Sequence, residues 1–417
     1  MGQLFVQLHK GPILFTANQS MALYKFRLGA MQALTRHGYE VIALAPADVY
    51  SEKIRQEGIR FIPLDMAIHE TNPVKDIVLF WKLFRLYKKL RPSLVFHFTI
   101  KPNIYGTLAA KLAGSIPSVS VVPGRGFTFQ KKNWLSRLVR LMYRVSLRYS
   151  KETWFLNEED RQFFIAEGLV KPDVTCVLPG EGVDTRHYSK SKSAEPGKEN
   201  GFTFLFAGRL MWEKGVGVFV EAARMVRRQH PAARFQLLGF LDSSDARVVP
   251  QTILQQWVEE GIIEFLGETM DVRPFFQHAD CFVLPSFYGE GVPRTLLEAA
   301  SMELPLITTN HRGCNRTLVD GISGFLCTPN DAGSLAEKMH AMLALSPAER
   351  FSMGKQGRNL AVTVFDESIL ASHYIERVVR YISAIPAPFP VSKIANVLPA
   401  FHTEKKTALT GVSVESA

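Results

Sequence analysis

The 417 residues of this chain are too many for one ordinary hydrophobic core, so two domains are the first expectation. Hydrophobic residues make up 47% and charged residues 21% of the chain, a balance that excludes a disordered protein. The formal net charge of +10 and the isoelectric point near 9.4 predict an acidic partner: nucleic acid, an anionic membrane or a phosphorylated substrate.

The four cysteines, Cys176, Cys281, Cys314 and Cys327, form no CxxC pair and have no histidine at metal-ligand spacing. We therefore expect neither a zinc site nor a disulfide framework, and reduced thiols in a cytoplasm. The first residues, MGQLFVQLHKGPILFTA, lack the long apolar run of a signal peptide or a transmembrane helix. These features predict a cytoplasmic protein.

Short apolar runs alternate with helical patterns through the first half of the chain. PILFTA, YEVIALAP and IRFIPL come first, and SLVFHFT, SVSVVPG and ETWFLN follow, each pair separated by a segment long enough for a helix. This alternation is typical of parallel strands joined by crossover helices. We predict one doubly wound domain over residues 12–186.

A second α/β domain is expected after a linker. Residues 187–201 are polar and lack apolar periodicity, which indicates the linker. The runs FTFLFAGRL, RFQLLGF, IIEFLG, CFVLP, LPLITT and GFLC then predict buried strands over residues 202–367. A helix at about 368–383 is expected to pack back on the first domain, and residues 384–417, rich in Pro, Ser and Thr, are expected to form a mobile tail. Two such domains face each other across a cleft, and ligands bind outside the carboxyl ends of the strands.

The segment GEGVPRTLLEAAS joins a predicted strand to a predicted helix. The backbone amides of Gly291, Val292 and Arg294 would lie at the positive end of that helix, a ready site for a phosphate. Glu298 stands more than one turn into the helix, where its carboxylate could accept hydrogen bonds from a ribose diol. Glu290 precedes the helix and would point at the group that a bound diphosphate carries.

A second turn in the same half carries two cations. Arg209 and Lys214 follow the strand FTFLFA and could neutralise a diphosphate, the arginine as a fork and the lysine as a point charge. The alternative is that Glu290 and Glu298 are ordinary solvated residues of a loop and a helix face.

Several of these motifs together resemble a known family. GRLMWEKG, the pair of glutamates with seven residues between them, and RGCNRTLVDGISGFLC are similar to the C-terminal half of retaining glycosyltransferases of the GT-B fold, family four. PGEGVDTRHY resembles the family's domain junction, usually written Asn-Gly-Val-Asp. FRLGAMQAL, TIKPNIYGTLAAKLAG and VPGRGFTF resemble bacterial transferases that extend undecaprenyl-diphosphate-linked sugars, including the type that adds N-acetylgalactosamine to diacetylbacillosamine. The resemblance covers residues 12–383, although TANQSMALYKFR stands where many members carry a Gly-Gly loop.

The resemblance implies a set of site residues at the matching positions. They are Arg209, Lys214, Gly291, Val292 and Arg294 for the donor diphosphate, Glu298 for its ribose, Glu290 and His97 for catalysis, and Lys101, Asn103 and Arg125 for the acceptor. It implies no metal and no cofactor, because the leaving phosphate is thought to take the acceptor proton during front-side attack. A histidine at a strand end is equally a structural residue, so that alternative stays open for His97.

The predicted function is transfer of a hexose or N-acetylhexosamine from a UDP-sugar to an undecaprenyl-diphosphate-linked saccharide, during assembly of bacterial surface polysaccharide or glycoprotein glycans. A UDP-sugar epimerase of the same two-domain shape is the main alternative. A nucleic-acid-binding protein fits the charge, but the sequence shows no RRM, KH, helix-turn-helix or zinc motif. A noncatalytic scaffold of the same fold would be expected to lose one of the two cations or two glutamates named above, and all four are present.

Two basic stretches predict a second partner. Residues 129–151 contain seven Lys or Arg and no acid, with Arg137, Arg140, Arg144 and Arg148 at helical spacing among apolar residues. Residues 81–93 add five more basic residues interleaved with aromatics. We expect peripheral binding to the anionic inner face of the cytoplasmic membrane. The alternative is a pair of solvated helix faces whose apolar residues lie in the core.

Overall fold

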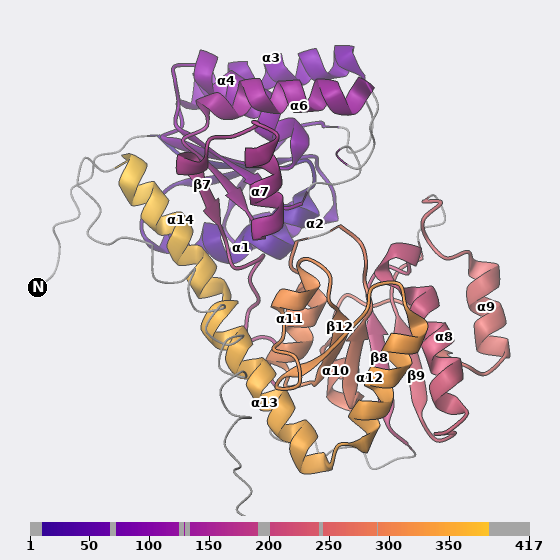
Figure 1. Cartoon of the computed structure of the whole chain (residues 1–417). Coiled ribbons are helices and arrows are strands. Elements are labelled where there is room, and N and C mark those ends of the chain that lie inside the picture. The colour runs from indigo at the N-terminus through magenta and orange to yellow at the C-terminus, as the bar shows by residue number, and fades with distance from the viewer. Residues whose placement is uncertain are drawn as a thin grey trace, which may run out of the picture.

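The computed structural model describes residues 11–66, 72–124, 129, 134–190, 201–241, 245–289 and 291–382. Two sheets of parallel strands lie in separate halves of the molecule (Figure 1). The N-terminal sheet has the order β3-β2-β1-β4-β5-β6-β7. Its strands are β1 Ile13–Thr16, β2 Val41–Ala45, β3 Arg60–Pro63, β4 Leu94–Phe98, β5 Ser118–Val122, β6 Glu152–Phe155 and β7 Thr175–Val177. The strand order reverses between β1 and β4, as in doubly wound folds.

The C-terminal sheet has the order β10-β9-β8-β11-β12-β13, and its order reverses between β8 and β11. Its strands are β8 Thr203–Ala207, β9 Arg234–Leu238, β10 Glu264–Phe265, β11 Cys281–Leu284, β12 Leu306–Thr309 and β13 Gly324–Cys327. The central strands β8, β11 and β12 are buried along their whole length, because helices cover both sides of a parallel sheet, whereas β9, β10 and β13 are partly exposed.

Helices cover the two faces of the N-terminal sheet through separate apolar clusters. One face carries α1 Ser20–Arg36, α2 Val49–Gln56 and α14 Glu367–Ile382. The other carries α3 Pro73–Leu90, α4 Thr107–Leu112, α6 Trp134–Ser146 and α7 Glu158–Ala166. A short π-helix, η1 (Pro102–Gly106), leads directly into α4. In Figure 1, α3, α4 and α6 form one layer at the top of the molecule.

The helices of the C-terminal half are α8 Val216–Arg227, α9 Gln251–Glu259, α10 Arg273–His278, α11 Arg294–Ser301, α12 Ala332–Ala344 and α13 Pro347–Val364. All of them contribute to the core around β8–β13. The boundary of α13 is written in the sequence: Ser346 and Glu349 form a reciprocal capping box, and Pro347 occupies the first turn.

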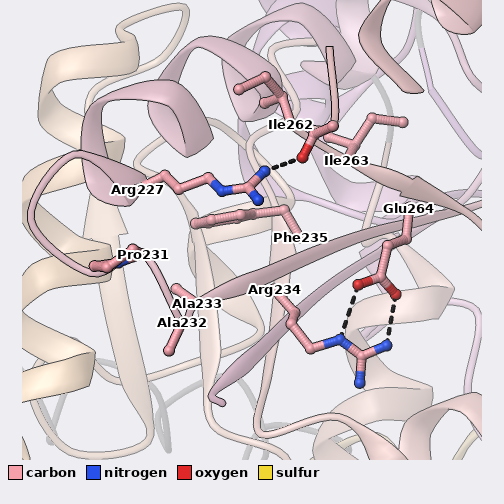
Figure 2. Close-up of a pocket in the computed structure, with 10 residues that line it drawn as sticks. Arg227, Pro231, Ala232, Ala233, Arg234, Phe235, Ile262, Ile263 and Glu264 are labelled. Carbon is pink, nitrogen blue, oxygen red and sulfur yellow. Dashed lines mark hydrogen bonds and ion pairs between the residues drawn. The ribbon is translucent and has the colours of Figure 1, made fainter. Parts of the chain in front are cut away.

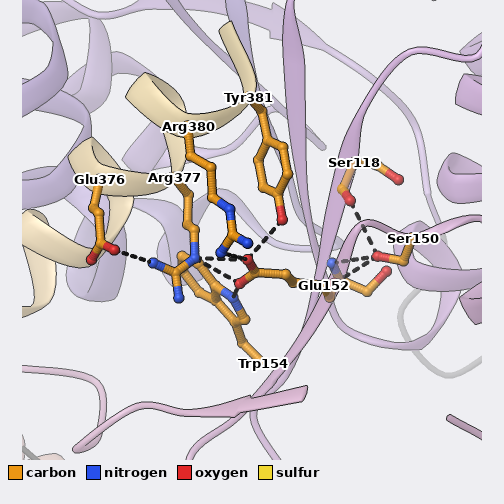
Figure 3. A network of polar contacts seen from close by, with 9 residues as sticks. Ser118, Ser150, Glu152, Trp154, Glu376, Arg377, Arg380 and Tyr381 are labelled. Atoms are coloured by element: carbon orange, nitrogen blue, oxygen red, sulfur yellow. Dashed lines mark hydrogen bonds and ion pairs between the residues drawn. The ribbon is translucent and has the colours of Figure 1, made fainter. Parts of the chain in front are cut away.

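Helix α14 leaves the C-terminal half and packs along α1 of the N-terminal half (Figure 1). Glu152 on β6 anchors it (Figure 3). The Nε of Arg377 donates to both carboxylate oxygens at 2.8 Å, and the hydroxyl of Tyr381 donates to one of them at 2.7 Å. Trp154 Nε1 donates to the other oxygen at 2.7 Å. These bonds compensate the buried carboxylate and tie the end of the described chain to the N-terminal sheet.

Candidate active site

The carboxyl ends of β8 and β11 lie side by side, at the point where the strand order of the C-terminal sheet reverses. The segments that follow the two strands also touch, since the backbone N–H of Phe287 donates to the carbonyl of Glu213 at 2.9 Å. Gly215 makes this contact possible. Its φ is +83°, and a Cβ added there would lie 2.2 Å from the carbonyl oxygen of Pro285. A crevice of this kind is where doubly wound sheets bind ligands.

Both predicted cations are carried by the segment that follows β8. Arg209 is exposed, and Lys214 is half-buried with its Nζ 5.9 Å from the centroid of the Tyr288 ring. Arg209 also faces Asp245, whose pKa is held well below its usual range by hydrogen bonds from Arg247 and, to a lesser degree, by the Arg209 charge. Lys214 therefore lies close to the residues that follow β11, and Arg209 stands at the same edge of the sheet.

The start of α11 retains the partial positive charge of its helix dipole. Within the described residues no side chain caps it, and its first turn holds no acid. The side chain of Val292 is buried in a small core with Val183 and Leu297, so that only its backbone could meet a ligand. Gly291 lies against the other domain, where a Cβ would come within 2.8 Å of the Pro123 carbonyl oxygen.

Glu298 is 7% exposed and lies where the two domains meet. Arg294, one turn earlier, donates from Nε to its carboxylate at 2.9 Å, and Tyr188 of the domain junction also hydrogen-bonds to it. Burial raises the pKa of Glu298, and the charges of Arg294 and of Lys25 on α1 oppose that rise. The guanidinium of Arg294 lies 5.5 Å from the ring centroid of Phe26, also on α1.

The sequence interpretation missed three of these neighbours. Tyr188 ends the junction motif PGEGVDTRHY, so its place in that motif was a usable signal. Lys25 and Phe26 belong to an ordinary amphipathic helix, and only the contact between the domains brings them to α11. Burial lowers the pKa of Lys25, and the nearby charges of Arg294 and Lys53 act in the same direction.

His97 occupies a different position from the one expected of a catalytic residue. Its ring is fully buried within β4, and its two nitrogens lie 2.9 Å from the Tyr87 hydroxyl and 3.1 Å from Thr107 Oγ1. Burial lowers the pKa of His97 to about 3. Gly106 packs so closely that a Cβ there would lie 2.5 Å from Nε2. With both nitrogens engaged in the core, the geometry supports the structural alternative rather than the catalytic assignment.

The predicted acceptor residues are engaged in the fold as well. Lys101 forms a half-buried ion pair with Asp76, at 2.8 Å, and the Tyr105 hydroxyl donates to the same carboxylate. Asn103 is fully buried and donates to the Val121 carbonyl at 2.9 Å. Both side chains therefore help to hold the segment after β4 in place, and the buried Oδ1 of Asn103 has no hydrogen-bond partner among the described residues. Their roles in acceptor binding stay predictions.

Thr99 is a residue at this edge that the sequence did not indicate. It follows β4 directly and has a φ of +72°, a strained value for a β-branched residue. Its buried hydroxyl has no hydrogen-bond partner among the residues that the structure describes. Strain and an unsatisfied hydroxyl at the carboxyl end of a central strand are typical of functional positions.

Two predicted site residues, Glu290 and Arg125, lie outside the described residues. Their roles in catalysis and in acceptor binding stay predictions. The expected mobile tail and most of the linker also lie outside the described residues.

Polar contacts fix the domain junction and hold the two domains together near this site. Arg27 on α1 is buried and forms an ion pair with Glu181, which ties the junction motif to the first domain at the position where the family usually has asparagine. Arg316 donates to the Leu156 carbonyl at 2.8 Å, and Arg312 lies 3.6 Å from the Asp160 carboxylate. The carboxyl edges of the two sheets are therefore joined by direct polar contacts.

The hollow drawn in Figure 2 lies elsewhere, at the amino ends of β9 and β10. Arg234 and Glu264 face each other there through two hydrogen bonds of 2.8 and 2.7 Å, and Arg227 donates to the Gly261 carbonyl. These groups satisfy one another on the far edge of the sheet from Glu298, so we assign no ligand to them.

The described part of the chain contains no group of three or more His, Cys, Asp or Glu side chains placed to hold a metal ion. None of its helices has the length and apolar content needed to cross a membrane.

Comparisons with known proteins agree with this architecture. Residues 201–344 match the family "Glycosyl transferases group 1", and residues 12–155 match "Glycosyl transferase 4-like". Among solved structures, HepE of Anabaena in complex with UDP and glucose superposes with a TM-score of 0.71 at 18% identity, covering 90% of this chain and all of that one. A glycosyltransferase from Rickettsia africae superposes with a TM-score of 0.72 at 17% identity, again over 90% of this chain and all of that one.

Two curated relatives are similar in sequence. One, from Campylobacter jejuni, is N,N'-diacetylbacillosaminyl-diphospho-undecaprenol alpha-1,3-N-acetylgalactosaminyltransferase, 27% identical over 89% of this chain and 99% of its own length. The other, from Escherichia coli, is UDP-Gal:alpha-D-GlcNAc-diphosphoundecaprenol alpha-1,3-galactosyltransferase, 28% identical over 70% of this chain and 76% of its own length.

Two Rossmann-like domains with these matches define a glycosyltransferase of the GT-B fold. Its two halves match a glycosyl transferase 4-like and a glycosyl transferases group 1 domain, so the glycosyltransferase domains and the fold predicted from the sequence are confirmed. The donor sugar, the stereochemistry of transfer and the individual site roles stay predictions.

Proposed function

We propose that this glycosyltransferase moves a hexose or N-acetylhexosamine from a UDP-sugar to an undecaprenyl-diphosphate-linked saccharide, with retention at the anomeric carbon. The observation that carries the proposal is the carboxylate of Glu298, buried beside the uncapped start of α11 in the same half as Arg209 and Lys214. The names of the two curated relatives, both of which act on undecaprenyl-diphosphate-linked sugars, support the acceptor class. The UDP complex of HepE supports the donor class.

In this proposal the donor lies along the carboxyl edge of the C-terminal sheet. Glu298 accepts hydrogen bonds from the ribose hydroxyls, replacing part of its present interaction with Arg294 and Tyr188. The amides at the start of α11, together with Arg209 and Lys214, bind the diphosphate. Negative charge grows on the leaving diphosphate as the glycosyl bond loosens, so these groups act most strongly in the transition state.

The acceptor hydroxyl would attack from the side of the N-terminal domain, and the leaving phosphate would take its proton. No metal is invoked for this step. Glu290 is proposed to contact the transferred sugar, by resemblance to the family. His97 is given no part in the chemistry, because both of its nitrogens are bound within the core.

We further propose that the enzyme works at the inner face of the cytoplasmic membrane. A polyprenyl acceptor is anchored in the bilayer, so only its diphosphate and sugars can reach an active site from the cytoplasm. Reversible binding of the membrane surface would bring the enzyme to this substrate. We propose that the enzyme acts there in the assembly of surface polysaccharide or glycoprotein glycans.

The test is release of UDP from a panel of UDP-sugars, with and without a short-chain polyprenyl-diphosphate-linked sugar, using the purified full chain. We expect one donor to release UDP only when the acceptor is present, and NMR of the product to show an α-linkage with an α-configured donor. Conversion of a donor without acceptor would indicate an epimerase instead. Silence across the panel would contradict the choice of UDP as the nucleotide.

A further inference from the structure

The outer surface of α6 carries an apolar stripe. Trp134, Leu138, Leu141 and Val145 follow at intervals of four, three and four residues, a spacing that places them on one side of a helix. All four are exposed, Trp134 to 74%. The side that faces the protein is formed instead by Ser136, Tyr143 and Ser146. These four apolar residues are therefore exposed rather than part of the core, whereas Tyr143 and Leu147 of the same stretch are core residues. The alternative left open by the sequence thus applies to only part of the stretch.

A second stripe runs along α3. Val74, Ile77, Val78 and Trp81 are exposed, with Trp81 at 50%, while Leu79, Leu83 and Tyr87 of the same helix are buried against the sheet. Both helices pack on the same face of the N-terminal sheet, with η1 and α4 between them (Figure 1). Their outer sides are turned to solvent from one layer, and Leu112 of α4, 62% exposed, adds apolar surface between them.

Basic residues surround these stripes. Arg85, Lys88 and Lys89 are exposed along α3, and Arg137 and Arg148 are exposed at α6 and just beyond it. Helices α4 and α6 contain no acid. The one acid of α3, Asp76, is paired with Lys101 and is only 15% exposed. The surface thus has two apolar stripes with positively charged side chains around them.

Two of the four arginines predicted to share a basic face are used differently. Arg140 pairs with Glu167 at the end of α7 and lies over the ring of Phe163. Arg144 donates to the carbonyls of Glu167 and Gly168 at 2.8 and 3.1 Å. These contacts hold α6 against the end of α7. The side chains of Arg140 and Arg144 are engaged there, and the apolar stripe of α6 stays exposed to solvent.

From this surface we infer a membrane-docking face, formed by the outer sides of α3, α4 and α6, that inserts its apolar stripes into the interface of an anionic bilayer. The occupant follows from the chemistry. Tryptophan and aliphatic side chains enter the headgroup and acyl boundary, and the surrounding cations attract anionic lipids. A nucleic acid would give the aliphatic residues nothing to pack against, and two copies of this positive face would repel each other.

The position of the face fits the acceptor. Helix η1 starts four residues after the end of β4 and leads into α4, so the face is continuous with the carboxyl edge of the N-terminal sheet. If the proposed function holds, a polyprenyl chain can stay in the bilayer while its diphosphate and sugar reach that edge. The docking itself does not depend on the donor or on turnover, so it can be tested separately.

The test is flotation of the full chain with vesicles of phosphatidylcholine alone or mixed with phosphatidylglycerol. We expect binding only to the mixed vesicles, weakening as salt rises. The double variant Trp81→Ser with Trp134→Ser should bind at least about tenfold more weakly, because both side chains leave the interface. Arg137→Glu should weaken binding as well. The matched controls are Phe351→Ser, which removes an exposed aromatic from α13, and Arg36→Glu at the end of α1; both should float like the parent chain.

Release of UDP with a soluble short-chain acceptor serves as the second readout. The double variant should keep full turnover there and lose it when a long-chain acceptor is held in vesicles. Equal flotation of the double variant and the parent would overturn the inference. Two other results would also overturn it. One is a concentration-dependent dimer of the parent chain in sedimentation that the double variant loses, without any vesicle binding, which would make the stripes a contact between copies. The other is salt-sensitive binding of RNA by the same residues.

Discussion

The carboxyl edges of the two sheets differ in how they use the residues that follow their strands. In the C-terminal half, Lys214 lies near the ring of Tyr288 just after β11, and the uncapped helix that begins at Arg294 carries the buried carboxylate of Glu298. In the N-terminal half, His97, Lys101 and Asn103 are all bound within the domain. Polar residues at strand ends are thus not equivalent: the C-terminal edge carries charged side chains and an uncapped helix start, whereas the N-terminal edge uses these polar groups to build a core. The first edge is where we place the donor.

The largest expected effect comes from removing a cation at the donor edge. Arg209→Ala should lower kcat by about 100- to 1000-fold, the usual cost of losing one group that stabilises transition-state charge. The donor KM should change little, because the contact is strongest when the diphosphate leaves. Steady-state kinetics with saturating acceptor measure this. The exposed Arg36→Ala serves as the control. An equal loss of kcat in both variants would contradict the role of Arg209 in stabilising the transition state.

His97 gives the most direct test of this comparison, because a core residue and a catalytic residue predict different effects when it is replaced: a loss of stability or a loss of turnover. As a core residue, His97→Ala should destabilise the fold by about 2–3 kcal/mol, through a cavity and the loss of two buried hydrogen bonds. The folded fraction should keep its turnover. Urea unfolding and the specific activity of native protein separate the two. A variant of normal stability with kcat lowered by orders of magnitude would restore the catalytic role.

The same residue is also expected to affect how the stability of the protein depends on pH, which is a smaller effect. The pKa of His97 is about 3 in the fold, well below the ordinary value near 6.5 expected for the unfolded chain. Below pH 6.5 the unfolded chain therefore binds the proton and the native protein does not, so stability falls as pH decreases toward 3. The slope from this group reaches at most about 1.4 kcal/mol per pH unit.

The variant His97→Gln lacks that proton, so its free energy of unfolding should fall less steeply between pH 6.5 and 4 than that of the parent. Chemical denaturation at several pH values measures both slopes. Among the described residues the other buried histidine is His373, which is present in both proteins, so its contribution cancels. Parallel curves would mean that His97 titrates normally in the fold.

Much of the donor edge could be predicted because its signals are local. GRLMWEKG and GVPRTLLE each place a strand, a turn and a helix start within one short stretch, so the positions of Arg209, Lys214 and Glu298 follow from strand order. The N-terminal edge lacked such signals. The burial of His97 depends on Tyr87 and Thr107, each ten residues away on a different helix.

The contribution of Lys25 and Phe26 could not be read from the sequence either, because it arises only where α1 meets α11 across the domain boundary. The same holds for the basic stretches. Their composition predicted a membrane surface, but which side of α6 faces outward depended on the contacts of Arg140 and Arg144 with α7.

The most direct test of the central claim is a calorimetric titration of UDP into the parent chain, Glu298→Ala and the exposed control Glu337→Ala. If Glu298 binds the ribose, its removal should raise the Kd for UDP by about 10- to 100-fold, the worth of hydrogen bonds to a charged group. Glu337→Ala should bind like the parent. An unchanged Kd in a folded Glu298→Ala protein would contradict the placement of the donor at this edge.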